Sequence, residues 1–245
     1  MRVCLVANRV KSDPRDNLLW IRANIALTLP LKPDLILFPE MCLTGLVNND
    51  DPSHDRNFAE PVPGPITSQM AKIARESGAW IGFGILEKDG DTMYDTAVLL
   101  EPNGNIALKY RRITPGWHGK NASLHIYKHG HQLVFAQTPF GKTTFLICGD
   151  LFDHNLLDQT KASEPELVLV PMARSHQREF QPELWYQQER GEYLEKANQL
   201  DSLVLIVNYV GDDGCFGGGF VVNQGHLIGE LKPGKAGVFF AEIPG

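Results

Sequence analysis

The chain has 245 residues and 43% of them are hydrophobic, which is enough to bury one sizeable core, so we expect a single domain over residues 1–245. The formal net charge is −6 and the longest basic run is Arg111-Arg112, which argues against a nucleic-acid surface because such surfaces need clustered Lys and Arg. No stretch approaches the roughly 18 apolar residues of a membrane-spanning helix, so we expect no membrane contact.

Strands and helices alternate through the first half of the chain. The helical spacing of Leu18, Ile21 and Ile25, which follows Asp13-Pro14, predicts a helix. The wholly apolar segment 35–39 is typical of a buried central strand. The predicted elements are strands at 3–8, 35–39 and 80–86, helices at 16–29 and 66–77, and a loop at 51–65.

The second half of the chain adds strands that tight turns connect. Asn103-Gly104 lies between two apolar runs and indicates a hairpin, and residues 182–199 form the longest predicted helix. The predicted strands are 96–101, 106–112, 133–137, 143–147, 166–171, 203–208, 217–222 and 237–243. Because apolar strands beside helices occur together with hairpin strands, we expect helices that cover sheets which also pack on each other.

Reactive side chains follow two of the predicted strands. Glu40 comes directly after an apolar strand, where partial desolvation favours a general base, although a solvated glutamate at a strand end is the simpler alternative. Cys148 also ends a strand, and Gly149 beside it would let a substrate approach closely. The alternative for Cys148 is an inert buried thiol, because a nucleophile needs a nearby base and no histidine stands out as one.

Three motifs occur together in a fixed order: Pro39-Glu40 followed by Thr44-Gly45, then Tyr110-Arg111-Arg112, then Ile147-Cys148-Gly149-Asp150. This arrangement resembles the nitrilase or carbon–nitrogen hydrolase superfamily over nearly the whole chain. The resemblance implies an α+β fold, a four-layer αββα sandwich, with a Glu–Lys–Cys catalytic set, no cofactor and a homodimeric assembly. It also implies that Glu40 takes the proton of Cys148, that the thiolate attacks the substrate, and that water hydrolyses the resulting thioester.

The lysine of that set is replaced in this sequence by Arg112. A guanidinium can still donate two N–H groups to an oxyanion, but it cannot easily give up a proton. Lys109 should point to the opposite face of its strand, whereas Lys120 lies in the following loop and could reach the site. A second glutamate of the family falls on Ser123 here, so the guanidinium could reach Glu40 directly instead.

Four further residues are candidates for contact with the substrate: Tyr110, Trp117, Gly149 and Arg174. Arg174 follows a predicted strand and could bind a carboxylate, although an ordinary exposed arginine is an equal alternative. We expect Asp150 to be structural and to hold the Cys148 loop by accepting backbone N–H groups.

The metal and redox signals in the sequence are weak. His125, His129 and His131 form a histidine tract, but no carboxylate or cysteine ligand accompanies it, so we predict no metal site. The four cysteines are irregularly spaced without a CxxC pair, and no signal peptide is recognised, so we expect reduced thiols and a cytoplasmic protein.

The sequence therefore predicts a hydrolase of non-peptide C–N bonds, with Glu40, Arg112 and Cys148 as catalytic residues and a small amide as substrate. A nitrile or an N-carbamoyl compound is a less favoured substrate. Two alternatives remain open at this point: a catalytically impaired protein of the same fold that binds or regulates through a small molecule, and an enzyme that transfers the acyl group to an acceptor other than water.

Overall fold

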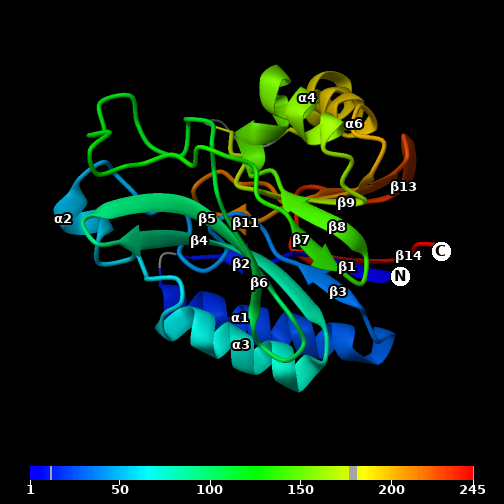
Figure 1. Cartoon of the computed structure of the whole chain (residues 1–245), viewed down its shortest axis with the longest axis horizontal. Coiled ribbons are helices and arrows are strands. Elements are labelled where there is room, and N and C mark those ends of the chain that lie inside the picture. Colours follow the sequence, from blue (N-terminus) through cyan, green and yellow to red (C-terminus); the bar gives the residue numbers. More distant parts are fainter. Residues whose placement is uncertain (12, 177–180, 245) are drawn as a thin grey trace.

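The computed structural model describes residues 1–11, 13–176 and 181–244. Two six-stranded sheets lie face to face, with α1 (Pro14–Thr28) and α3 (Pro65–Ser77) outside the first sheet, and α4 (His154–Ala162) and α6 (Arg190–Asn198) outside the second (Figure 1). The predicted four-layer αββα sandwich is thereby confirmed.

The first sheet has the strand order β14-β1-β3-β4-β5-β6. The strands β1, β3 and β4 run parallel to one another, and the remaining neighbours are antiparallel. The short strand β3 is buried along its whole length, which explains its uninterrupted apolar sequence. The strands are β1 (Arg2–Ala7), β3 (Leu35–Leu37), β4 (Trp80–Asp89), β5 (Thr92–Leu100), β6 (Ile106–Arg111) and β14 (Gly237–Glu242).

The second sheet has the order β13-β12-β10-β9-β8-β7, in which β8, β9 and β10 are parallel. The strand β13 was not predicted, because its side chains are mostly solvent-accessible and give no strong apolar signal. The strands are β7 (Ala136–Thr138), β8 (Gly141–Phe145), β9 (Leu167–Met172), β10 (Leu203–Asn208), β12 (Gly219–Asn223) and β13 (His226–Leu231). Two further two-residue strands, β2 (Arg9–Val10) and β11 (Val210–Gly211), pair with each other.

Capping residues mark the start of α1 and the end of α3. The Asp13 side chain accepts a hydrogen bond from the Arg15 N–H at the start of α1, and Gly78 ends α3 in the left-handed conformation, with φ at 68°. The predicted long helix 182–199 is wrong in its middle, because a π-helical turn separates two α-helical pieces. The short elements are η1 (Leu29–Leu31), α2 (Pro52–Asp55), η2 (Cys148–Phe152), α5 (Pro182–Leu184) and the π-helical η3 (Trp185–Glu189).

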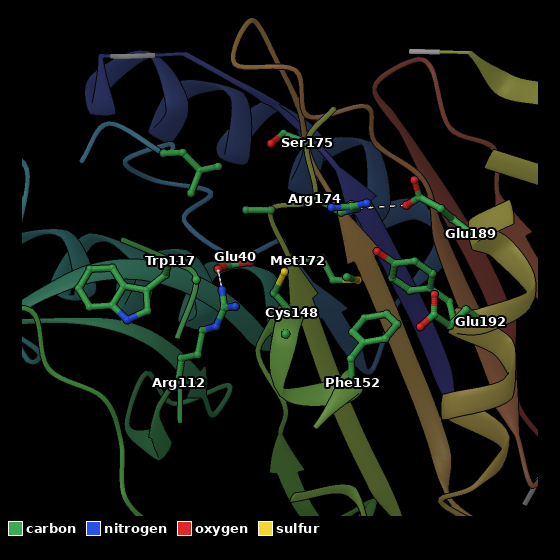
Figure 2. Close-up of a pocket in the computed structure, with 15 residues that line it drawn as sticks. Glu40, Arg112, Trp117, Cys148, Phe152, Met172, Arg174, Ser175, Glu189 and Glu192 are labelled. Atoms are coloured by element: carbon green, nitrogen blue, oxygen red, sulfur yellow. Dashed lines mark hydrogen bonds and ion pairs between the residues drawn. The ribbon is translucent and has the colours of Figure 1, made fainter. Parts of the chain in front are cut away.

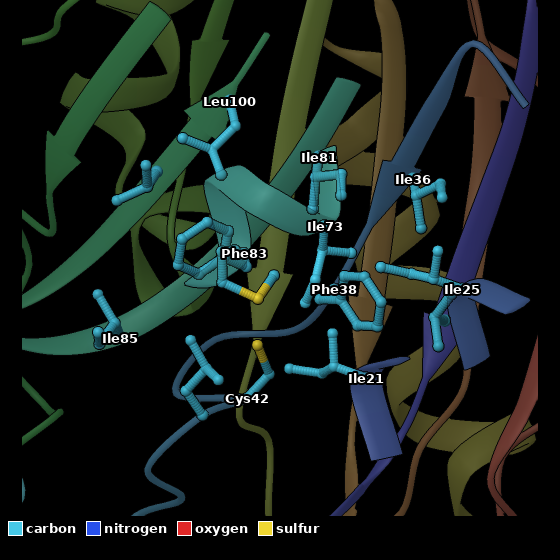
Figure 3. Packing of buried hydrophobic residues seen from close by; sticks show 14 of the residues in the cluster. Ile21, Ile25, Ile36, Phe38, Cys42, Ile73, Ile81, Phe83, Ile85 and Leu100 are labelled. Atoms are coloured by element: carbon cyan, nitrogen blue, oxygen red, sulfur yellow. The ribbon is translucent and has the colours of Figure 1, made fainter. Parts of the chain in front are cut away.

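Among the described residues, the apolar core forms four clusters, three of which are levels that correspond to the interfaces between layers. The central level joins the two sheets through fully buried side chains such as Leu37, Phe145 and Leu205. Figure 3 shows the outer level beneath the first sheet, where Ile21 and Ile73 of the helices meet Phe38. Each such side chain contributes about 1.5–3 kcal/mol when it is buried, so the central level fixes how the two sheets sit on each other.

Among the described residues, none of the helices has both the length and the apolar character that crossing a lipid bilayer demands.

Candidate active site

A cavity of about 410 Å³ opens where the strand ends of both sheets meet. Figure 2 shows Glu40, Arg112 and Cys148 around it, and Trp117 and Arg174 on its walls. The structure thus brings together the three side chains that were predicted to be catalytic, although they are separated by up to 108 positions in the sequence (148 − 40). Its other lining residues are Leu46, Gly116, Gly149, Phe152, Met172, Ala173, Ser175, Glu189, Glu192 and Tyr193.

Cys148 begins the turn η2 in an unusual backbone conformation. Its φ is +47°, in the left-handed region that non-glycine residues seldom adopt. Such a conformation persists only where neighbouring contacts impose it, and it occurs often at active sites. Here it lifts the sulfur out of the sheet and toward the cavity (Figure 2).

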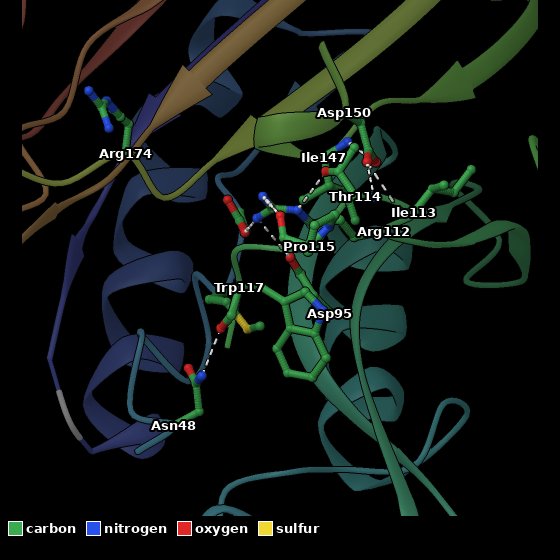
Figure 4. Close-up of polar contacts among 12 residues, drawn as sticks. Asn48, Asp95, Arg112, Ile113, Thr114, Pro115, Trp117, Ile147, Asp150 and Arg174 are labelled. Atoms are coloured by element: carbon green, nitrogen blue, oxygen red, sulfur yellow. Dashed lines mark hydrogen bonds and ion pairs between the residues drawn. The ribbon is translucent and has the colours of Figure 1, made fainter. Parts of the chain in front are cut away.

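Asp150 supplies the contacts that hold this turn. Its carboxylate accepts hydrogen bonds from the backbone N–H groups of Ile147 at 3.1 Å, Ile113 at 3.2 Å and Thr114 at 2.8 Å (Figure 4). The carboxylate therefore fastens the Cys148 turn to the segment that carries Arg112. The structural role that was predicted for Asp150 is confirmed.

Tyr110 does not line the cavity, so its predicted contact with substrate is wrong. The side chain is fully buried between the two sheets, and its hydroxyl donates a 2.7 Å hydrogen bond to Asp150. The prediction failed because residues 110 and 112 share a face of the chain but lie at different depths. Tyr110 is inside the sandwich, whereas Arg112 lies just beyond the end of β6.

Arg112 and Glu40 form a buried ion pair. The Arg112 Nη1 lies 2.9 Å from Glu40 Oε1, and the two side chains are only 6% and 1% exposed. The predicted direct contact between this guanidinium and Glu40 is confirmed. Arg112 also donates from Nε to Thr114 Oγ1 at 3.3 Å and from Nη2 to the Pro115 carbonyl at 3.1 Å, so its plane is fixed from three sides (Figure 4).

The two nearby lysines do not substitute for Arg112. Lys109 points away from the cavity and binds Glu87 at 2.9 Å, as the alternation along a strand predicted. Lys120 is exposed to solvent and is absent from the described lining of the cavity. Arg112 is therefore the cation that faces both Glu40 and Cys148.

The charges in this cavity act on one another. Burial, the largest single cause, disfavours the charged form of Arg112, but the negative charges around it, Glu40 first and then Asp95 and Asp150, together outweigh burial and raise the pKa of Arg112 above its ordinary value. Burial, followed by the negative charge of Glu40, raises the pKa of the Cys148 thiol to about 12, although Arg112 opposes the shift. Cys148 is therefore a thiol at neutral pH, and it needs a base at the moment of attack.

The other predicted substrate contacts lie on the cavity wall. Trp117 is nearly fully buried, and its carbonyl accepts a 2.7 Å hydrogen bond from the Asn48 side chain. The Arg174 guanidinium is paired with Glu189 of η3 at 3.1 Å, so its charge is already compensated. Gly149 lies beside Arg112, where it leaves open the space in which a side chain would stand.

Several site residues were not predicted from the sequence. Phe152, Glu192 and Tyr193 line the cavity from η2 and α6, and no motif identifies them. Asp95 of β5 is buried 3.7 Å from Arg112, and the only signal for it was that it is the one acidic residue of its strand.

The histidine tract takes part in an ordinary aromatic contact. The His129 ring stacks on His118, with 2.9 Å between their Nε2 atoms. Among the described residues, no group of three or more histidine, cysteine or acidic side chains is arranged to hold a metal ion.

Comparison with protein families identifies the group to which this site belongs. A family model described as carbon–nitrogen hydrolase matches residues 2–201. The chain belongs to the carbon–nitrogen hydrolase family. The superfamily that the sequence motifs indicated is thereby confirmed.

Curated carbon–nitrogen hydrolases match a limited segment of the chain. A formamidase of Bacillus cereus (strain B4264) is 40% identical over 84 residues, which are 34% of this chain and 25% of that protein. An aliphatic nitrilase of Sinorhizobium fredii is 37% identical over 93 residues, which are 38% of this chain and 29% of that protein. The matched segments thus span only a quarter or slightly more of these relatives.

Solved structures match the carbon–nitrogen hydrolase fold along the entire chain. An amidase of Nesterenkonia sp. AN1 covers 100% of this chain and 93% of its own, with a TM-score of 0.80 at 20% identity. A carbon–nitrogen hydrolase of Helicobacter pylori G27 covers 98% of this chain and 88% of its own, with a TM-score of 0.84 at 16% identity. At these identities the likeness establishes the fold.

Proposed function

We propose that this protein hydrolyses the C–N bond of a small amide through a thioester on Cys148. The observation that carries the proposal is the convergence of a thiol, a carboxylate and a guanidinium on one cavity of about 410 Å³. Similar proteins support it, since they include formamidases and an amidase of Nesterenkonia sp. AN1, a mutant of which carries acrylamide added to its active-site cysteine. A nitrile or an N-carbamoyl compound is a secondary candidate substrate.

The acylation half of the reaction uses Glu40 twice. Glu40 removes the thiol proton as the Cys148 sulfur attacks the carbonyl carbon, and a C–S bond forms while the carbonyl oxygen becomes an oxyanion. When the C–N bond breaks, the proton on Glu40 passes to the departing nitrogen, which leaves as ammonia or an amine. Arg112 cannot serve as this proton donor because its charge is permanent.

The oxyanion would be stabilised beside Gly149. Three of the five N–H groups of Arg112 are engaged by Glu40, Thr114 and Pro115 among the described residues, so donors remain for an incoming oxygen. A Cβ on Gly149 would lie 2.5 Å from Arg112 Nη2, so the absent side chain leaves room for the carbonyl next to that nitrogen.

The deacylation half reverses these roles. Water attacks the thioester carbon while Glu40 takes one of its protons, the C–S bond breaks, and the proton returns to the sulfur. The acid then leaves. No redox partner or cofactor enters the balance, because every bond change is a transfer of an acyl group or a proton.

One observation favours the alternative of a binding module. The ion pair with Arg112 occupies one oxygen of Glu40, and that oxygen would have to remain engaged or be released during proton transfer. A protein of this kind would bind small amides without turning them over.

Ammonia release from formamide, acetamide, propionamide and the matching nitriles tests the proposal. We expect turnover of at least one amide and an acyl adduct on Cys148 by intact-mass spectrometry. Cys148→Ala should reduce kcat by about a thousandfold or more, whereas Cys215→Ala, which removes a buried thiol outside the cavity, is the matched control. Amide binding without ammonia or adduct would establish the binding module, and product without free acid would indicate acyl transfer to another acceptor.

A further inference from the structure

Two buried carboxyl groups next to Arg112 have oxygens without a hydrogen-bond donor among the described residues. Among the described residues, Glu40 Oε2 and both oxygens of Asp95 have no hydrogen-bond partner. Arg112 Nη1 is 3.7 Å from Asp95 Oδ2, which is too long for a hydrogen bond but short enough for attraction between charges. A buried oxygen without a donor is costly, so this arrangement needs an explanation.

Glu40 and Asp95 face the same nitrogen of Arg112. Arg112 Nη1 lies 2.9 Å from Glu40 Oε1 and 3.7 Å from Asp95 Oδ2, and two carboxylates placed around one nitrogen have no hydrogen to share. A single proton between them would turn a repulsive contact into a hydrogen bond. It would also satisfy one oxygen of each residue at once.

The charge balance of the buried group leads to the same conclusion. Glu40, Asp95 and Arg112 carry a net charge of −1 if both acids are ionised, and zero if the two acids hold one proton. A buried net charge is expensive, and two adjacent carboxylates rarely ionise together. Burial, then the charge of Glu40, raises the pKa of Asp95 well above its ordinary value, and the charge of Asp150 adds to the effect while Arg112 opposes it.

We propose that Asp95 and Glu40 share one proton at neutral pH, and that Asp95 is a positioning residue which holds Glu40 in place beside Cys148. The inference rests on the proposed function only for its effect on turnover. Asp95 is absent from the described lining of the cavity, so it acts through Glu40 and does not touch the substrate. Its own backbone supports the arrangement, because its carbonyl accepts the Arg112 N–H at 2.8 Å.

Asp95→Asn is the decisive variant because an amide mimics a protonated acid. Its NH₂ group can donate to Glu40 Oε2, so we expect kcat/KM to stay within about threefold of the wild type, whereas Asp95→Ala should lose about tenfold to a hundredfold. In the wild type, loss of the shared proton at high pH places a second charge beside Glu40, and kcat/KM falls. Asp95→Asn has no such proton, so this alkaline fall should weaken or move to higher pH.

A spectroscopic readout separates this inference from the proposed function. Infrared difference spectra of protein labelled with ¹³C at aspartate and glutamate carboxyls should show the carbonyl stretch of a protonated acid at neutral pH, and Asp95→Asn or Glu40→Gln should abolish it. This signal is expected even if no amide is hydrolysed. Its absence in the wild type, or its persistence in Asp95→Asn, would overturn the proposal.

Asp55→Asn is the matched control for loss of a buried carboxylate. Asp55 is fully buried outside the cavity and accepts hydrogen bonds from the Asn49 N–H and the Tyr127 hydroxyl, so an amide there should lower Tm. Asp95 accepts no hydrogen bond among the described residues, so Asp95→Asn should leave Tm at neutral pH equal or higher. The raised pKa of Asp95 makes wild-type stability decline as pH rises toward that pKa, and Asp95→Asn should remove this decline. A large fall in Tm for Asp95→Asn at neutral pH would show an ionised Asp95 that Arg112 needs.

Discussion

Gly149 stands so close to Arg112 that a methyl group on its Cα would lie 2.5 Å from the guanidinium Nη2. The guanidinium cannot easily retreat, because Glu40, Thr114 and Pro115 hold it. A side chain at position 149 would therefore collide with Arg112, and in the proposed mechanism the oxygen of the reacting carbonyl takes this space.

Gly149→Ala should lower kcat/KM by about tenfold to a hundredfold, because the new methyl group either displaces Arg112 or fills the position of the oxyanion. Steady-state kinetics with the best amide would measure it. Gly191→Ala is the control, since no atom lies within 4 Å of its added Cβ and alanine favours a helix by about 0.5–1 kcal/mol. Equal activity of Gly149→Ala and wild type would show that the substrate lies elsewhere.

Arg112→Lys restores the residue that the superfamily resemblance leads one to expect. We predict that kcat/KM falls about tenfold, because an ammonium keeps the charge near Glu40 but loses the planar contacts to Thr114 and Pro115. Arg112→Met should lose about a hundredfold more, because it removes the charge. A gain of activity in Arg112→Lys from an inactive wild type would instead support the binding module.

Cys148 should react slowly with iodoacetamide at neutral pH and increasingly fast up to pH 10 and beyond. The reason is that its thiol pKa is raised to about 12, first by burial and then by Glu40, whereas a free cysteine titrates near pH 8.5. Mass-spectrometric rates of alkylation against pH would measure this. Glu40→Gln removes the negative charge and should shift the profile to lower pH. A wild-type plateau near pH 8.5 would contradict the expectation.

Asp150→Asn should reduce the free energy of unfolding by about 2–4 kcal/mol. The NH₂ group of asparagine replaces one carboxylate oxygen and faces backbone N–H groups, which are also donors. The N–H groups of Ile147, Ile113 or Thr114 then lose their acceptor. Urea titration would measure the change. Tyr110→Phe removes only one hydrogen bond to the same carboxylate and should cost about 1 kcal/mol. Similar losses for both variants would show that the backbone contacts contribute little.

The resemblance to the carbon–nitrogen hydrolases predicted the sandwich and the set of Glu40, Arg112 and Cys148, whereas local patterns indicated only that Glu40 and Cys148 follow apolar strands. Asp95 escaped notice because it lies inside a strand, and only the fold reveals that Arg112 faces it. Tyr110 was misplaced because alternation gives the face of a strand but not the depth along it. The π-helical η3 was also missed, since residue spacing does not specify where a helix widens by one residue.

The proposed nucleophile and its proposed base belong to different sheets: Glu40 follows β3 of the first sheet, whereas Cys148 follows β8 of the second. The thickness of the apolar layer between the sheets therefore sets the distance between the Cys148 sulfur and the Glu40 carboxylate. Gly82 allows the layer to pack closely, because a Cβ at this position would lie 2.9 Å from Leu37 and 3.6 Å from Phe145. Repacking this layer would therefore change the distance between the Cys148 sulfur and the Glu40 carboxylate while every cavity side chain stayed the same.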